Sequence, residues 1–263
     1  KIKGGSKMSE NIKTIMDGLG ENEFILPVGY KDEDGVVHRT VTLRPMTGET
    51  EEAIADPKIR DNGGKVITAL LESVIEKIGT LPRVTKDIIR DLTTIDRDFL
   101  LIKNRQVSLG DNISYTDICP HCRAKNEIHV NLSNIEPKYL ENEEDRELTF
   151  DLPIGYTDAS GTVHKEITIT LPTGRVQERV AQMVRANPAQ ATTIMLQLIT
   201  LKLGTLEFIN PDVFKKMTKK DRDFISNKLS ELEVGVKFDT EVICSECGSE
   251  FVTSIPLQSL LGE

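Results

Sequence analysis

The period of the apolar and polar positions changes along the chain. Residues 24–44 consist of a short apolar run, a Gly-containing turn and a second run that alternates with period two, which predicts a β-hairpin. Apolar side chains over 66–78 are spaced by three and four residues and stop at Gly79, which predicts a helix. Another helix is expected over 94–107, followed by a second hairpin with two cysteines at its turn. The pattern therefore predicts an α+β fold.

The same pattern occurs twice in the chain. Residues 24–48 and 150–174 share twelve identities, all at an offset of 126 positions. Farther on the offset becomes 125, and the Asp-Arg-Asp-Phe sequence at 96–99 recurs at 221–224. Unrelated sequences would share about one or two residues over a stretch like the first. We therefore infer an internal duplication, which places further helices at 194–204 and 219–232.

The duplication sets the expected domain organisation. A first repeat at 24–133 and a second at 150–263 are joined by an acidic, apolar-poor linker at 134–149. A flexible tail is expected at 1–23, whose residues 1–7 resemble a cloning remnant as much as native sequence. We expect the two hairpin, helices, hairpin units to be related by pseudo-twofold symmetry, as symmetric partners commonly are.

Composition narrows the possible functions. The 263 residues are 38% hydrophobic, but no apolar run approaches the roughly 18 residues of a membrane span. The net charge of -9, the absence of Trp and the 5% aromatic content argue against a protein that neutralises phosphates or stacks on bases. The beginning of the chain has no apolar segment like that of a secretory signal, so we expect a reducing compartment, where cysteines serve metal or redox chemistry.

The cysteines form two matched pairs. Cys119 and Cys122 lie at the turn of one predicted hairpin, and Cys244 and Cys247 lie at the turn of its repeat. Each Cys-x-x-Cys hairpin supplies half of a zinc ribbon, whose closed structural site needs four thiolates. In ordinary zinc ribbons the two cysteine pairs are about 15–20 residues apart. The pairs of this chain are much farther apart in sequence, but a duplication can bring two distant turns together. We predict one structural Zn²⁺ per chain, bound by all four cysteines.

Other interpretations of the cysteines fit the sequence less well. A redox dithiol normally follows a strand at a helix N-terminus, whereas strands are predicted on both sides here. Two partial sites, each completed by histidine, would use His121, but the second repeat has Glu246 at that position. Cysteines that are merely buried apolar residues do not explain two pairs with the same spacing.

Other repeated polar residues do not assemble an active site. His38 recurs as His164, and each is expected to be a solvated cross-strand partner beside a turn. Asp96 and Asp98 would point about 200° apart on a helix and cannot share one face, so Arg97 or Arg222 is expected to pair with an acidic neighbour. Nucleotide-binding, nucleophile-elbow and metalloprotease motifs are missing. We therefore predict neither catalytic nor cofactor-binding residues, no small-molecule substrate and no enzyme activity.

The order of motifs in each repeat resembles that of the T-even phage baseplate hub family. The residues that carry the resemblance are Leu26, Pro27, Gly29, Tyr30, Asp96, Arg97, Phe99, Cys119, Pro120 and Cys122, with Leu152, Pro153, Gly155, Tyr156, Asp221, Arg222, Phe224, Cys244 and Cys247. One departure is Ser245, where the first repeat has Pro120. The resemblance implies a structural or assembly protein of a contractile phage tail, or of a tail-like injection particle, assembled in the bacterial host cytoplasm, whose partners are other phage tail baseplate or hub proteins.

An alternative function is a zinc-ribbon adaptor that binds nucleic acid or transcription machinery. Its charge pattern is unfavourable, because Arg123 and Lys125 flank the first cysteine pair but Glu246 and Glu250 flank the second. We therefore expect no binding to nucleic acid and none to membranes.

Overall fold

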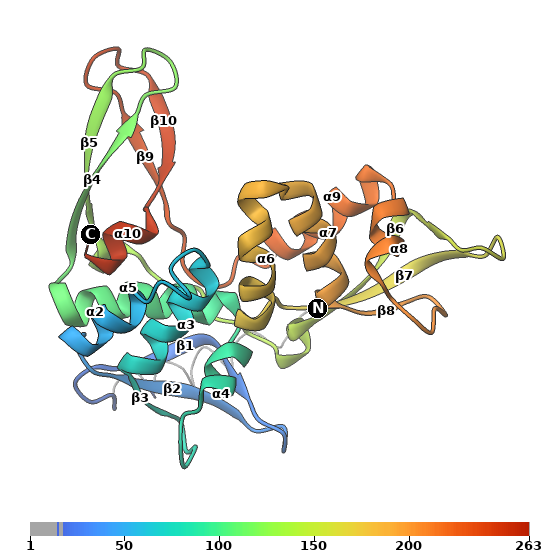
Figure 1. Ribbon diagram of the computed structural model, residues 1–263, viewed down its shortest axis with the longest axis horizontal. Coiled ribbons are helices and arrows are strands. Elements are labelled where there is room, and N and C mark those ends of the chain that lie inside the picture. The colour runs from blue at the N-terminus through green and yellow to red at the C-terminus, as the bar shows by residue number, and fades with distance from the viewer. Residues whose placement is uncertain (1–14, 16–17, 263) are drawn as a thin grey trace, which may run out of the picture.

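Two three-stranded antiparallel sheets, one in each half of the chain, organise the molecule (Figure 1). The computed structural model describes residue 15 and residues 18–262. The first sheet contains β1 (Glu23–Lys31), β2 (Val37–Leu43) and β3 (Ile75–Ile78), and the second contains β6 (Glu147–Thr157), β7 (Val163–Thr170) and β8 (Thr200–Leu203). The prediction of a flexible tail at 1–23 falls mainly outside the described residues.

Each sheet is covered by its own set of helices. In the first half these are α2 (Gly48–Ile54), α3 (Gly63–Val74), α4 (Lys86–Asp91) and α5 (Thr94–Leu109). In the second half they are α6 (Gly174–Ala186), α7 (Pro188–Ile199), α8 (Pro211–Lys216) and α9 (Lys219–Ser230). We call β1–β3 with α2–α5 the first body, and β6–β8 with α6–α9 the second body. Two 3-10 turns, Leu132–Asn134 and Glu143–Arg146, lie between them in sequence.

Helix caps explain where several of these helices begin. The side chains of Thr93 and Thr218 accept a hydrogen bond from the backbone N–H three residues later, at Asp96 and Asp221. The predicted helix start at Thr47 is confirmed, because α2 begins directly after this residue with a capping box. The α+β prediction is confirmed as well. No helix within the described residues has the length and apolar character needed to cross a membrane.

One element prediction was wrong. The helix expected over 66–78 ends at Val74, and the four residues that follow form strand β3 on the edge of β2. Ile75 and Ile78 are both buried in this strand. Their β-branched side chains fit a strand as well as a helix, and pairing with β2 decides the outcome. The same break follows α7, where Thr200–Leu203 pairs with β7.

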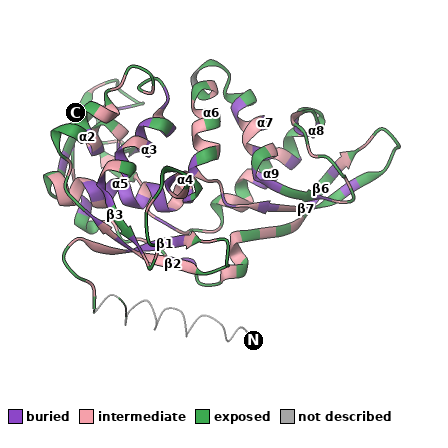
Figure 2. Ribbon diagram, turned by 60° about the horizontal axis from the view of Figure 1, so that its bottom comes forward, coloured by how far each residue is buried: buried purple, intermediate pink, exposed green. Residues whose placement is uncertain are grey.

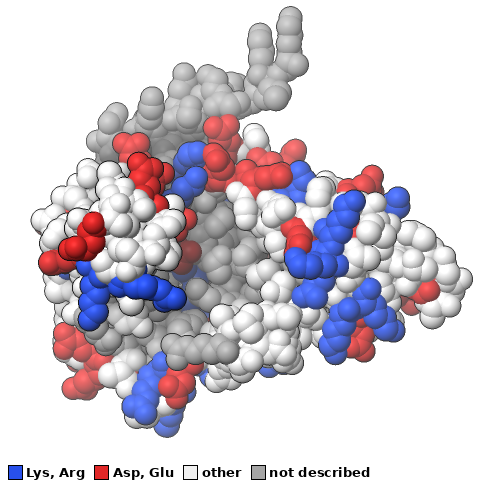
Figure 3. Space-filling model, turned by 90° about the horizontal axis from the view of Figure 1, so that it is seen from above, with Lys and Arg blue, Asp and Glu red and all other residues white. Residues whose placement is uncertain are grey.

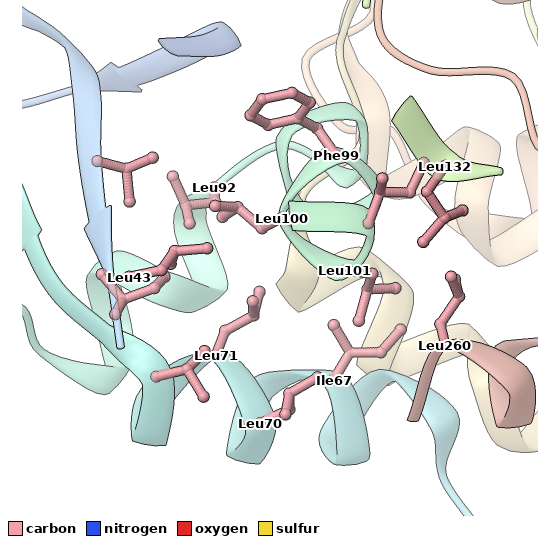
Figure 4. Packing of buried hydrophobic residues seen from close by; sticks show 14 of the residues in the cluster. Leu43, Ile67, Leu70, Leu71, Leu92, Phe99, Leu100, Leu101, Leu132 and Leu260 are labelled. Atoms are coloured by element: carbon pink, nitrogen blue, oxygen red, sulfur yellow. The ribbon is translucent and has the colours of Figure 1, made fainter. Parts of the chain in front are cut away.

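The core of the first body receives residues from the end of the chain. Leu43, Leu71 and Leu100 pack between β2, α3 and α5, and Leu260 of α10 (Leu257–Leu261) joins the same cluster (Figure 4). A separate core in the second body includes Phe214. Figure 2 shows buried residues along α3, α5 and the first sheet. Residues of the predicted second repeat thus contribute to both cores, and the unit bounds 24–133 and 150–263 stay a prediction.

The repeated histidines are buried rather than solvated. His38 is 6% exposed and His164 is 4% exposed. The ring of His38 lies 2.8 Å from the carboxylate of Asp32, and that of His164 lies 3.0 Å from the carboxylate of Asp158. The expectation of a solvated partner was therefore wrong. Each histidine joins its hairpin turn to the loop that follows β3 or β8, so its repetition has a structural cause.

Asp98 yields a pH-dependent prediction. Burial raises the pKa of this carboxyl to about 6, although the neighbouring Arg97 opposes the shift. In the unfolded chain the carboxyl of an aspartate is hydrated and has a pKa of about 3.9. At neutral pH folding therefore transfers a negative charge from water into a desolvated position. Asp98 therefore has no effect on stability below the unfolded pKa, and its destabilising effect grows as the pH rises from about 3.9 to the folded pKa of about 6, above which it is constant.

We expect Asp98→Asn to raise the free energy of unfolding by about 1–2 kcal/mol at pH 7 and to leave it unchanged at about pH 3, as measured by urea denaturation. Partial exposure of Asp98 keeps this gain below the full value of the shift. The matched control is Asp223→Asn, at the exposed counterpart of Asp98 in α9, which should change stability by less than about 0.5 kcal/mol. Equal gains at both pH values would contradict the assignment.

Candidate metal centre

Two cysteine hairpins project together from the first body (Figure 1). One consists of β4 (Asn112–Ile118) and β5 (Lys125–Asn131), and the other of β9 (Asp239–Ile243) and β10 (Glu250–Ser254). Their turns meet at the tip, so two Cys-x-x-Cys sequences more than a hundred residues apart become neighbours. The base of the first hairpin is anchored by Ile113 and Ile128, which belong to the core of the first body.

The two turns have the same backbone conformation. The N–H of Arg123 donates to the carbonyl of Cys119 at 3.0 Å, and the N–H of Gly248 donates to that of Cys244 at 2.9 Å. Arg123 and Gly248 directly follow the second cysteine of their pair and have positive φ angles of 66° and 71°. This left-handed residue reverses the chain so that both thiols of a turn face the same side. Glycine adopts it without strain, whereas Arg123 does so at a steric cost.

The four thiols form one compact cluster. The Sγ atoms of Cys119 and Cys247 are 3.8 Å apart, those of Cys122 and Cys244 are 3.6 Å apart, and all four lie within 4.8 Å of one another. Four sulfurs placed about 2.3 Å from a central Zn²⁺ at tetrahedral angles would be about 3.8 Å apart. The cysteines are all free thiols. The donor set and its spacing therefore fit a closed four-thiolate site.

Backbone amides favour negative charge on the second pair. The N–H groups of Cys247 and Glu246 lower the pKa of Cys244 to about 6. At Cys122 the N–H of Ala124 also acts to lower the pKa, but the surrounding thiols prevail and raise it to about 12. Four thiolates at this separation repel one another strongly, so complete ionisation needs a cation among them.

Side chains on the hairpins join the two turns next to the thiols. Asn126 is 4% exposed, accepts a hydrogen bond from the N–H of Ser245 at 3.0 Å and directs its Nδ2 at the sulfur of Cys244, 3.6 Å away. The hydroxyl of Thr253 donates to Asp117 across the same interface. A proline at position 245 could not donate to Asn126, which gives a physical reason for the serine that departs from Pro120.

Sequence reasoning placed the four cysteines but missed Asn126. Its counterpart in the second hairpin is Phe251, so the repeat comparison gave no signal for a shared role. The available signal was a polar residue on the buried face of an alternating strand. His121 is exposed on the first turn and is not part of the thiol cluster found among the described residues.

Comparison with known protein families identifies a match. The family model described as T4 bacteriophage base plate protein matches residues 21–183, which is more than half of the chain. The match runs from before β1 into α6 and includes the first cysteine pair, while the second pair lies beyond it. Searches of curated proteins and of solved structures found no match.

Proposed function

The chain belongs to the T4 bacteriophage base plate protein family, and from this premise we propose that it is a non-enzymatic structural or assembly subunit held in shape by a metal. Family membership establishes a phage baseplate protein and hence a place in a phage tail particle. The proposal adds that the subunit is assembled in the bacterial host cytoplasm and works by binding neighbouring baseplate or hub proteins.

The observation that carries the proposal is the junction of two distant hairpins at one thiol cluster. We propose that Cys119, Cys122, Cys244 and Cys247 bind a single structural Zn²⁺. Zn²⁺ prefers four thiolates in a closed site, and such sites hold small, weakly packed segments together. The ion would tie the β9–β10 hairpin of the second predicted repeat to the β4–β5 hairpin of the first. We further propose that these repeats, at 24–133 and 150–263, are duplicated units with the acidic linker between them.

Zinc stoichiometry tests the metal site directly. We expect a native mass spectrum of the protein, produced with zinc and without chelator, to show one zinc per chain. Cys247→Ser should lose the metal, because three thiolates bind far more weakly than four. The matched control is Ser254→Ala, at an exposed serine of β10, which should retain it. A wild-type protein without zinc, or with a mass loss that corresponds to a disulfide, would overturn the proposed site.

The baseplate role has a separate test. Tails and baseplate intermediates purified from infected cells would be separated by sedimentation, and each fraction would be analysed for this chain by quantitative mass spectrometry. The proposal expects the chain in one of these particles or in a complex with their proteins. Its recovery only as free protein at every stage of assembly would contradict the role.

A further inference from the structure

The two bodies meet through different faces. The first turn of α6 and the residues before it, 172–178, rest on a surface of the first body made by α3, α4 and α5. We call 172–178 the docking turn and the surface under it the receiving surface. The N–H of Thr94 donates to the carbonyl of Pro172 at 2.8 Å, and the N–H of Gly174 donates to that of Leu92 at 3.0 Å. The backbone of the second body is thus bonded directly to the first.

Charged side chains complete this contact. Arg175 in the docking turn forms ion pairs with Asp91 and with Asp87. Glu178 accepts from Arg90 at 3.1 Å, so the charges alternate across the contact. At the centre, Arg97 donates to the side chain of Gln177 at 2.9 Å.

The repeat gives each body an equivalent of both surfaces, and within residues 18–262 two of these are left open. The counterpart of the docking turn is 46–52 in the first body, and that of the receiving surface lies on α7, α8 and α9. A Cβ added to Gly174 would meet Arg97 at 2.5 Å, whereas one added to Gly48, its counterpart, would meet nothing within 4 Å. Val28 is fully buried beside the receiving surface, but its counterpart Ile154 is 46% exposed.

The open surfaces carry charges that complement each other. The open docking turn contains Glu49, Glu51 and Glu52, and each is exposed. The open receiving surface contains Lys215, Lys216 and Arg222. Its acidic Asp212 is paired with Lys215 at 2.8 Å. Figure 3 shows groups of Lys and Arg side chains on the lobe of the second body.

Position by position, three polar pairs of the internal contact have counterparts of opposite charge on the two open surfaces. The Arg175–Asp91 pair corresponds to Glu49 and Lys216. The Glu178–Arg90 pair corresponds to Glu52 and Lys215, and the Gln177–Arg97 hydrogen bond corresponds to Glu51 and Arg222. The first of these pairs has its signs reversed, the second keeps them and the third gains a carboxylate, so three acidic side chains match three basic ones, whereas the Arg175–Asp87 pair corresponds to Glu49 and Asp212, which are both acidic. The two surfaces lie at opposite ends of the molecule, with α2 to the left and α8 to the right in Figure 1.

We propose that a second copy of this chain places its open docking turn, 46–52, on the open receiving surface of α7–α9. The contact is head to tail, so successive copies form a ring where the rotation closes and an open chain where it does not. Ala189 stands where the internal contact has Gly64, whose added Cβ would meet Glu178 at 2.7 Å. The docked turn therefore lies farther from α7 than the docking turn 172–178 lies from α3. Long charged side chains then make a larger part of this contact than of the internal one. This inference does not depend on the metal site.

Charge reversal tests the contact with the full, metal-loaded chain. Sedimentation velocity over a range of protein concentrations should show self-association that weakens as salt is added. Lys215→Glu with Lys216→Glu should weaken it by about tenfold or more, and Glu49→Lys with Glu52→Lys should do the same. Mixing the two double variants should restore association, because each then offers the complement of the other. Circular dichroism checks that both variants fold.

The matched control reverses two exposed strand lysines, Lys77 and Lys202, and should leave the association unchanged. A wild-type chain that stays monomeric at every concentration would overturn the proposal. So would association that survives both double variants, or a mixture of the two that remains monomeric although each variant is folded.

Discussion

Replacing Arg97 by alanine is expected to lower the free energy of unfolding by about 3–5 kcal/mol. The side chain is fully buried between the two bodies. It donates to the carbonyls of Ile89 and Gly64 and to the side chains of Thr68 and Gln177, at 2.9–3.0 Å. Alanine would leave these acceptors without a donor and open a cavity where the bodies meet. Urea denaturation followed by circular dichroism measures the loss.

The repeated Asp-Arg-Asp-Phe sequence supplies the matched control for this prediction. Arg222 occupies the same place in the second body and donates to Ala189 and Thr193, but its outer side is partly exposed, since none of the described segments covers it as α6 covers Arg97. Arg222→Ala should therefore cost less than about 1 kcal/mol, since water can replace the lost donor. Losses of similar size in the two variants would show that the docking of the second body contributes little to the burial of Arg97.

The guanidinium of Arg97 stays charged at this contact between the two bodies. Desolvation lowers the pKa of Arg97 to about 10, with Glu178 opposing the shift, so the side chain stays protonated at neutral pH. Sequence analysis expected Arg97 to pair with an acidic neighbour, and this was wrong, because its four partners are carbonyl, hydroxyl and amide oxygens. Five N–H donors in a fixed plane suit such a set of acceptors better than a single carboxylate would.

The local elements were predictable from the sequence because they depend on local chemistry. Hairpins with Gly-containing turns, the capping threonines and the two Cys-x-x-Cys turns each have a short-range signal. The repeated sequence pattern then predicted that the four cysteines could meet, which their separation in sequence alone would not suggest. Their clustering within 4.8 Å agrees with that reasoning.

What remained hidden depends on long-range packing. The break between α3 and β3 follows from pairing of Ile75–Ile78 with β2, which no periodicity reports. The repeats also differ in what covers them. Arg97 and Arg222 lie in identical Asp-Arg-Asp-Phe sequences, yet the first is buried by α6 and the second is not. Asn126 was missed for the same reason, since its role depends on the approach of the other hairpin.

Removal of the metal is expected to loosen the tip of the cysteine hairpins and to spare both bodies. The buried apolar cluster at the tip consists of Cys119, Cys244 and Phe251, which is too little to hold two-stranded hairpins in place. A structural Zn²⁺ contributes on the order of 10 kcal/mol to the folding of small sites. Without it, the hairpins keep the Asn126 and Thr253 hydrogen bonds and the apolar contact of Val242 with the core of the first body.

Hydrogen exchange read by mass spectrometry resolves this effect along the chain. After treatment with a chelator, or in Cys244→Ser, amides of 239–254 should exchange at least about a hundredfold faster, because opening the tip now costs several kcal/mol less. The base of β4–β5 should change less, since Ile113 and Ile128 remain in the core of the first body. Strands β1 and β2, far from the tip, are the internal control and should keep their protection. Equal protection of 239–254 with and without metal would show that packing alone joins the hairpins. Loss of protection in β1 and β2 as well would mean that the metal holds the whole first body together and not only its tip.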